Sequence, residues 1–128
     1  MVAAYNEPPY KYFHVASGTT TTAGGTTIKA NTVTTGASAP GVNTVVAPGV
    51  LHSITFNTTG ATVAPITVYD GYSYTGAGGP LPEGNVIAVI TPVLTTDPFT
   101  LIFDIGYSVG LLFVQTAAST MDYTFSYS

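Results

Sequence analysis

The segment that decides the fold is Val50-Leu-His-Ser-Ile-Thr-Phe-Asn57, which alternates along its length. Successive side chains of a β-strand point to opposite faces, so a period of two predicts a strand here. One face of this expected strand carries Val50, His52, Ile54 and Phe56. The other face carries Leu51, Ser53, Thr55 and Asn57.

Similar short segments occur on both sides of this one. Further strands are expected at Tyr12–Ala16, Thr26–Ala30, Asn43–Ala47, Ile66–Tyr69, Val86–Ile90, Phe99–Ile105, Leu111–Thr116 and Met121–Ser128. Glycine, proline and aspartate, which favour turns, fall between the later segments. No stretch has the 3.6-residue period of a helix. The pattern predicts an all-β protein, an antiparallel β-sandwich that is jelly-roll-like.

The two parts of the chain differ in composition. Residues 1–49 contain Pro-Pro, Gly-Gly and a run of threonines, with only short apolar segments between them. Residues 50–128 contain nearly all the strong strand patterns. We therefore expect an extended N-terminal arm and irregular lead-in with short strands over 1–49, and a β-sandwich body over 50–128. The stretch Thr19–Thr27 fits either an exposed strand or a linker.

The low charge of the chain excludes several classes of function. Charged residues make up only 6% of the sequence, whereas about 25% is usual. They are two lysines and six aspartate or glutamate residues, and there is no arginine. Catalysis, phosphate binding and metal binding need charged or strongly coordinating groups gathered in one place. Two lysines would neutralise few phosphates of a nucleic acid. We expect no enzyme, no cofactor, no metal site and no nucleic-acid partner.

Membrane and export signals are not visible in the sequence. Apolar runs such as Val86–Ile90 and Leu111–Val114 are far short of the roughly 20 residues of a membrane helix. The first residues lack the basic end and apolar run of a secretory signal. There is no cysteine and hence no disulfide. We expect a protein made in the cytoplasm without a signal peptide and without a membrane partner.

The histidines and one aspartate are the polar residues to account for. A zinc site needs three or four ligands, and the chain has only His14 and His52. We expect His52 to be packed or at a rim, and His14 to make contacts beside the aromatic residues of the lead-in. Asp104 is expected to point outward or to cap a turn. A calcium site built from Asp70, Asp104 and backbone carbonyls is the alternative.

Aromatic and aliphatic residues supply three candidate contact sites. Tyrosine and phenylalanine concentrate at contact surfaces, and the arm carries Tyr5, Tyr10, Tyr12 and Phe13. We expect these to lie on a shell or a partner subunit, or else to fold back onto the sandwich. A subunit contact is expected at Val86, Ile87, Val89 and Ile90. Tyr72 and Tyr74 are expected in one long loop and, with the loop Gly76–Pro82, form an alternative glycan platform.

The order of the strand segments resembles a known family. The relevant segments are Leu51–Asn57, Ile66–Gly71, Val86–Ile90, Phe99–Asp104, Gly110–Thr116 and Asp122–Tyr127. They resemble the small β-sandwich virion proteins of tailed bacteriophages, among them head decoration (cement) proteins. The resemblance covers about residues 50–128, and no resemblance is found for the first fifty residues.

The resemblance implies a structural function without catalysis. A cement protein of this kind binds the major capsid protein at symmetry axes of an icosahedral shell, often as a homotrimer, and stabilises the capsid. It would be made in the host cytoplasm and located on the capsid surface of the virion. The alternative is a receptor- or glycan-binding module associated with a tail or fibre.

Overall fold

All regular structure in the described residues is β-strand. The computed structural model describes residues 10–30, 32–35, 42–45, 48–76 and 79–128. The strands are β1 (Lys11–Val15), β2 (Thr26–Ala30), β3 (Thr32–Thr35), β4 (Val42–Val45), β5 (Gly49–Thr58), β6 (Ile66–Gly76), β7 (Gly79–Ile90), β8 (Phe99–Tyr107), β9 (Gly110–Val114) and β10 (Asp122–Tyr127). Within these residues no helix is long and apolar enough to cross a membrane.

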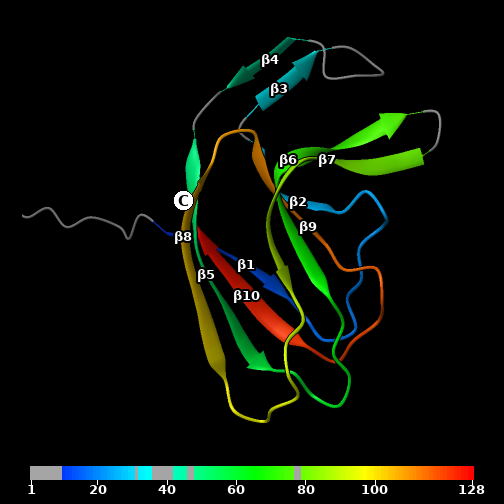
Figure 1. Cartoon of the computed structure of the whole chain (residues 1–128), viewed down its shortest axis with the longest axis vertical. Coiled ribbons are helices and arrows are strands. Elements are labelled where there is room, and N and C mark those ends of the chain that lie inside the picture. Colours follow the sequence, from blue (N-terminus) through cyan, green and yellow to red (C-terminus); the bar gives the residue numbers. More distant parts are fainter. Residues whose placement is uncertain (1–9, 31, 36–41, 46–47, 77–78) are drawn as a thin grey trace, which may run out of the picture.

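Eight of the strands form two sheets that pack against each other (Figure 1). Sheet A has the order β1-β10-β5-β8, and sheet B has the order β2-β9-β6-β7. Strands β3 and β4 form a separate two-stranded sheet. All pairs are antiparallel. The prediction of an all-β antiparallel sandwich is confirmed.

Strands β1 and β2, which the sequence assigned to the lead-in, are members of the two sheets. β1 pairs along its length with β10, and β2 pairs with β9. The sandwich therefore begins well before residue 50 and includes residues 11–15 and 26–30. The strand expected at Asn43–Ala47 is observed as β4, and its last two positions lie outside the described residues.

The core is built around Phe113 of β9. Its ring lies 5.1 Å from the ring of Phe125, 6.0 Å from that of Phe13 and 6.3 Å from that of Tyr123. Because Phe13 belongs to β1 and the other two belong to β10, these contacts place β1 and β10 of sheet A across from β9 of sheet B. Aromatic pairs at such distances add to the free energy gained from burying their area.

A buried glutamine joins the two sheets at one end. Gln115 follows β9 and is 1% exposed. Its Nε2 lies 3.1 Å from the carbonyl oxygen of Thr19, 3.2 Å from that of Ala117 and 3.0 Å from Ser119 Oγ. The hydroxyl of Tyr123 donates to Gln115 Oε1. A buried side-chain amide is stable only when its donors and acceptors are satisfied, and this one is.

Gln115 also holds the threonine run before β2 in place, through its main chain. The Thr21 amide donates to the Gln115 carbonyl at 2.8 Å, and the Gln115 amide donates to Thr21 Oγ1 at 3.0 Å. Thr21 is buried. The open question about Thr19–Thr27 is therefore answered in two parts: the first residues are a fixed connection, and β2 begins at Thr26.

The faces predicted for β5 are wrong at one end. Leu51, Ile54 and Phe56 are all fully buried, so Leu51 shares the core face instead of opposing it. The cause is an irregularity at His52: Leu51 pairs with Tyr127 of β10 and Ser53 pairs with the adjacent Ser126, so His52 is an extra residue of β5. A β-bulge adds a residue to one strand and so shifts the alternation beyond it.

Tyr72 and Tyr74 lie in a strand rather than in the expected long loop. β6 and β7 pair from Ile66↔Ile90 to Gly76↔Gly79, and the part beyond Asp70 has no partner in β9. Figure 1 shows this part projecting from the sheets as a two-stranded ribbon. Gly71 is needed where the two strands approach, because a Cβ there would lie 1.9 Å from the Glu83 carbonyl oxygen.

Candidate functional site

The outer face of sheet A gathers both histidines and two exposed tyrosines. On β1, Tyr12 and His14 point outward because they alternate with Phe13 and Val15, which pack in the core. The outward residues of β10 and β5 continue this face across the sheet. We call it the Tyr–His face, and it comprises Tyr10, Tyr12, His14, His52, Asn57, Asp104 and Asp122.

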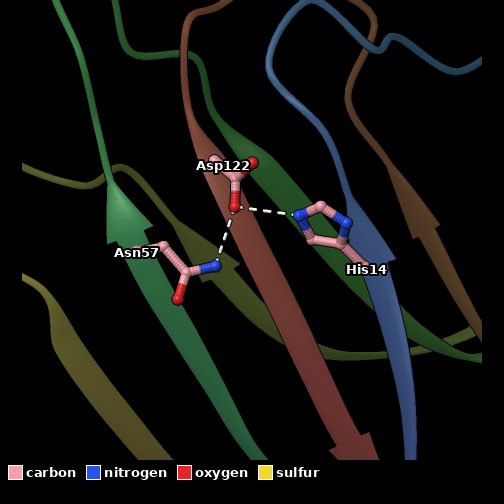
Figure 2. Close-up of polar contacts among 3 residues, drawn as sticks. All are labelled: His14, Asn57 and Asp122. Carbon is pink, nitrogen blue, oxygen red and sulfur yellow. Dashed lines mark hydrogen bonds and ion pairs between the residues drawn. The ribbon is translucent and has the colours of Figure 1, made fainter.

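Three strands meet at one carboxylate of this face (Figure 2). The imidazole Nε2 of His14 on β1 donates to Asp122 Oδ1 of β10 at 2.9 Å. Asn57 Nδ2 of β5 donates to the same oxygen at 2.7 Å. The hydrogen bond from Asn57 lowers the pKa of Asp122 below 3.8, and His14 adds to this, while partial burial opposes it. The cluster therefore links three neighbouring strands through an ionised carboxylate.

The second histidine pair lies where β5 and β8 are irregular. His52 Nδ1 donates to Asp104 Oδ1 at 3.1 Å. Asp104 has a positive φ of 49°, a conformation that aspartate tolerates better than most residues. The ring of Tyr10 packs edge-on against His52 with centroids 4.1 Å apart. The expectation that Asp104 points outward is confirmed, because its side chain is largely exposed.

The Asp122 cluster predicts a pH-dependent contribution to stability. Asp122→Asn is expected to lower the free energy of unfolding by about 0.5–1 kcal/mol at neutral pH. A lowered pKa in the folded state stabilises the fold above the ordinary value of 3.8, and this contribution is lost as pH falls through the folded pKa. Urea unfolding of the unmodified protein and of Asp122→Asn, measured from about pH 5 to about pH 2, should show that the difference between their free energies of unfolding decreases as the pH falls.

The control for this pH dependence is Asp97→Asn, at an exposed aspartate of the β7–β8 connection. Its difference from the unmodified protein should change little over the same range. A difference for Asp122→Asn that stays constant down to the lowest pH would contradict the assigned role of this carboxylate.

The residues expected in the contact arm divide into three groups. Tyr5 lies outside the described residues. Tyr10 and Tyr12 are exposed, Tyr12 to 66%. Phe13 instead packs against the core, because alternate residues of β1 face opposite ways. Of the expected arm, the structure brings Tyr10 and Tyr12 together on the Tyr–His face.

The residues expected at a subunit contact also divide. Val86 and Val89 of β7 are exposed, whereas Ile90 is buried and Ile87 packs against the core. Only Val86 and Val89, half of the predicted set, are therefore accessible for a contact at this sheet edge.

Other aliphatic side chains that follow these valines in the chain are also exposed, which the sequence did not indicate. Val93 and Leu94 of the β7–β8 connection and Ile102 of β8 are also exposed. We call the set Val86, Val89, Val93 and Leu94 the β7–β8 surface. Its members are between 54% and 74% exposed. Ile102 is not one of them, because it pairs with Ser53 on the outer face of sheet A, whereas Val86 and Val89 lie on the outer face of sheet B. The one available signal was the Val-Leu pair within a Pro- and Thr-rich connection.

The alternative glycan platform has a different setting from the one expected. Tyr72 and Tyr74 are two residues apart on β6 and so share one face of the ribbon. Glu83 pairs directly with Tyr72, and Leu81 with Tyr74. Desolvation, with the neighbouring Glu83 carboxylate, raises the pKa of Tyr72 above 10. An acidic group therefore lies beside the tyrosines, because the pairing of β6 with β7 brings Glu83 opposite Tyr72.

The carboxylates do not gather into a metal site in the described part of the chain. No group of three or more His, Asp or Glu is placed to hold an ion there. Asp70 accepts the amides of Ser108, Val109 and Gly110 at 3.1, 2.7 and 3.3 Å, so it caps the β8–β9 turn. Asp104 is engaged with His52 on the other sheet. The calcium alternative from Asp70 and Asp104 is not supported.

Comparison with known proteins adds no relative. No protein-family model, no curated protein and no solved structure matches this chain. The Tyr–His face and the β7–β8 surface are therefore the basis for a functional assignment.

Proposed function

We propose that this chain is a non-enzymatic structural protein of a virion, which decorates and stabilises an icosahedral phage capsid as a cement protein. The observation that carries the proposal is the presence of two separate contact surfaces on one small sandwich. The Tyr–His face offers exposed tyrosines, and the β7–β8 surface offers exposed aliphatic side chains. A lattice decoration needs one surface for the shell and another for its own copies.

The sheet order also supports the proposal. Without the β3–β4 hairpin, the strands in chain order make sheets 1-8-3-6 and 2-7-4-5. We interpret this order as a jelly roll, an architecture found in viral capsid and lectin domains. Since one fold hosts many functions, this is support by analogy, and the contact surfaces carry the greater weight.

Each surface has a partner in this proposal. Tyr10 and Tyr12 contact the major capsid protein at the capsid surface, together with Tyr5 of the arm. Tyrosine suits this role because its ring buries a large apolar area while its hydroxyl keeps a polar contact. The exposed valines of β7 contact other copies in a homo-oligomer, with a trimer favoured. Repeated weak contacts over a lattice add up through multivalency.

The test is occupancy on particles. The chain should be present in sedimented particles in a fixed ratio to the major capsid protein, measured by quantitative mass spectrometry. Tyr10→Ala with Tyr12→Ala should then lower occupancy at least about tenfold, because exposed aromatic residues dominate contact energies. The matched control is Tyr72→Ala with Tyr74→Ala, which should leave occupancy unchanged. Absence of the unmodified chain from particles would refute the proposal.

A second candidate is a receptor- or glycan-binding module at a tail or fibre. The observation that favours it is the ribbon face with Tyr72 and Tyr74 beside Glu83. Aromatic rings can stack on sugars while a carboxylate accepts hydrogen bonds from their hydroxyls. On this reading only a few copies occur per particle. In that case Tyr72→Ala with Tyr74→Ala abolishes binding to cells or glycans, whereas Tyr10→Ala with Tyr12→Ala leaves this binding unchanged.

A further inference from the structure

We propose that Tyr10, His52 and Asp104 form a binding site for an arginine side chain of another protein, and we call these three residues the Asp104 site. The inference rests on the proposed function and deepens it, because it names the chemistry by which the Tyr–His face recognises the capsid protein. It can also be tested on the isolated chain, so its failure is distinguishable from a failure to bind particles.

The Asp104 site lies where two neighbouring strands of sheet A contain extra residues. His52 is an extra residue of β5, because Leu51 and Ser53 on either side of it pair with adjacent residues of β10. Between the β8 partners of the same two residues, β8 contains both Phe103 and Asp104. Bulges re-aim side chains and are frequent beside functional sites. Here the two irregularities bring an imidazole and a carboxylate together on the outer face.

The main chain at Asp104 has a conformation that most residues avoid. Its φ is 49°, and within the described ranges no other residue except glycine has a positive φ. Such a conformation costs free energy, and residues held in it are concentrated at binding sites and active sites. The Asp104 side chain is 68% exposed. An exposed residue held in this way indicates a function in binding rather than in packing.

One carboxylate oxygen of Asp104 is open to a ligand. Oδ1 accepts the hydrogen bond from His52 Nδ1 at 3.1 Å, whereas Oδ2 has no hydrogen-bonding partner within the described residues. Asp122, the other acid of the Tyr–His face, already accepts from His14 and Asn57. Its side chain is also less exposed, at 27%. Asp104 is therefore the more accessible carboxylate of this face.

Tyr10 adds an aromatic ring to the Asp104 site. The ring packs edge-on against His52, with the centroids 4.1 Å apart and the ring planes at 70°. Tyr10 is 42% exposed, so part of its surface is open to solvent. A guanidinium group can stack on an aromatic face while its N–H groups donate to a carboxylate. The Asp104 site offers both contacts, because a ring and a carboxylate flank the same imidazole.

An exposed apolar residue lies beside the Asp104 site. Ile102 pairs with Ser53 on the outer face of sheet A and precedes Asp104 by two residues in β8. It is 76% exposed, more than any other large apolar residue in the described part of the chain. A partner that covers Ile102 excludes water from the neighbouring charge pair, and opposite charges attract more strongly where water is excluded. Ile102 therefore forms an apolar rim beside the charged anchor.

The sequence indicates that the ligand comes from another protein. The chain contains no arginine, so a second copy cannot supply a guanidinium group. Its two lysines lie on other edge strands, Lys11 on β1 and Lys29 on β2. The formal net charge of −4 favours a partner with a basic surface, since complementary charges steer association and fix specificity. In the proposed function this partner is the major capsid protein.

The first experiment uses the isolated chain and the peptide acetyl-Gly-Arg-Gly-amide, titrated at constant ionic strength and followed by NMR. The peptide should shift the signals of Tyr10, His52 and Asp104, and the same peptide with lysine in place of arginine should shift them less. Asp104→Asn is the test variant, because asparagine keeps an acceptor for His52 and tolerates a positive φ. It should weaken binding of the arginine peptide about threefold to fivefold. Asp97→Asn is the control with the same change in charge, and it should leave binding unchanged.

The second experiment measures the occupancy of the chain on particles at increasing salt concentration. Occupancy of the unmodified chain should fall as salt rises, because salt screens a charge pair at the edge of a contact. At low salt, Asp104→Asn should lower occupancy at least about tenfold, because the arginine of the partner is left without its carboxylate. The remaining occupancy should depend less on salt. Asp97→Asn should behave as the unmodified chain does.

Each outcome decides between the two proposals. No shifts at the three residues, or equal peptide binding by Asp104→Asn and Asp97→Asn, would overturn the Asp104 site. Normal occupancy of Asp104→Asn on particles would also overturn it and leave the proposed function standing. Peptide binding that depends on Asp104, in a chain absent from particles, would support the site and refute the proposed function. Tighter binding of the lysine peptide, together with self-association of the isolated chain, would overturn the assignment to arginine in favour of a lysine of a second copy.

Discussion

Phe113→Ala is expected to lower the free energy of unfolding by about 3–5 kcal/mol. The Phe113 side chain is 1% exposed, and its ring contacts three aromatic rings of the opposite sheet. Removing it leaves a cavity that the two sheets cannot close, because β9 is fixed between β2 and β6 by its main-chain hydrogen bonds. The loss should appear as a lower midpoint of urea unfolding with an unchanged slope.

The control for this substitution is Phe103→Ala on edge strand β8. Phe103 is only partly buried and packs against the margin of the core, so its removal should cost about 1–2 kcal/mol. Equal losses for the two substitutions would mean that Phe113 is not the centre of the core.

Gln115→Leu is expected to cost about 2–4 kcal/mol, although leucine is similar in size and more apolar. The substitution leaves the Thr19 and Ala117 carbonyls, Ser119 Oγ and the Tyr123 hydroxyl without their partner. Each buried polar group left unsatisfied costs about 1–3 kcal/mol, which exceeds the gain from added apolar area. Thermal and urea unfolding measure the loss.

Tyr123→Phe is the matched control, because it removes one partner of the network and leaves the amide donors of Gln115 satisfied. It should cost about 1–2 kcal/mol, less than Gln115→Leu. Burial raises the pKa of the Tyr123 phenol above its ordinary value, so this hydroxyl stays a donor in the folded protein. A more stable Gln115→Leu protein would contradict the structural role of the network.

The fold could be predicted where alternation is regular. In β10, Tyr123, Phe125 and Tyr127 are buried and the residues between them are not, as the period of two predicts. In β5 the same rule failed at Leu51, because the irregularity at His52 depends on how β5 pairs with β10. Local sequence does not specify such a shift, since the partner residues Ser126 and Tyr127 lie near the other end of the sequence.

The exposure of the candidate contact residues was predicted only in part. Tyr10 and Tyr12 are exposed, whereas Phe13, which was expected among the contact residues, packs against the core because side chains alternate along β1. Val93 and Leu94 were missed because their exposure depends on Thr59 fixing Thr95 from another strand. Aliphatic residues in a connection are usually expected to turn inward, and only the tertiary contacts determine otherwise.

The pairing of β1 with β10 has a consequence for synthesis. Lys11 lies opposite Tyr127, and β2 pairs with β9, so the earliest strands find their neighbours only in the most distant part of the sequence. During synthesis, β1 and β2 remain without their partner strands until β9 and β10 have left the ribosomal exit tunnel. Folds dominated by such distant pairings close slowly, on a scale of milliseconds to seconds. The nascent chain therefore completes its sandwich after translation of β10, and its low charge leaves little repulsion to keep waiting chains apart.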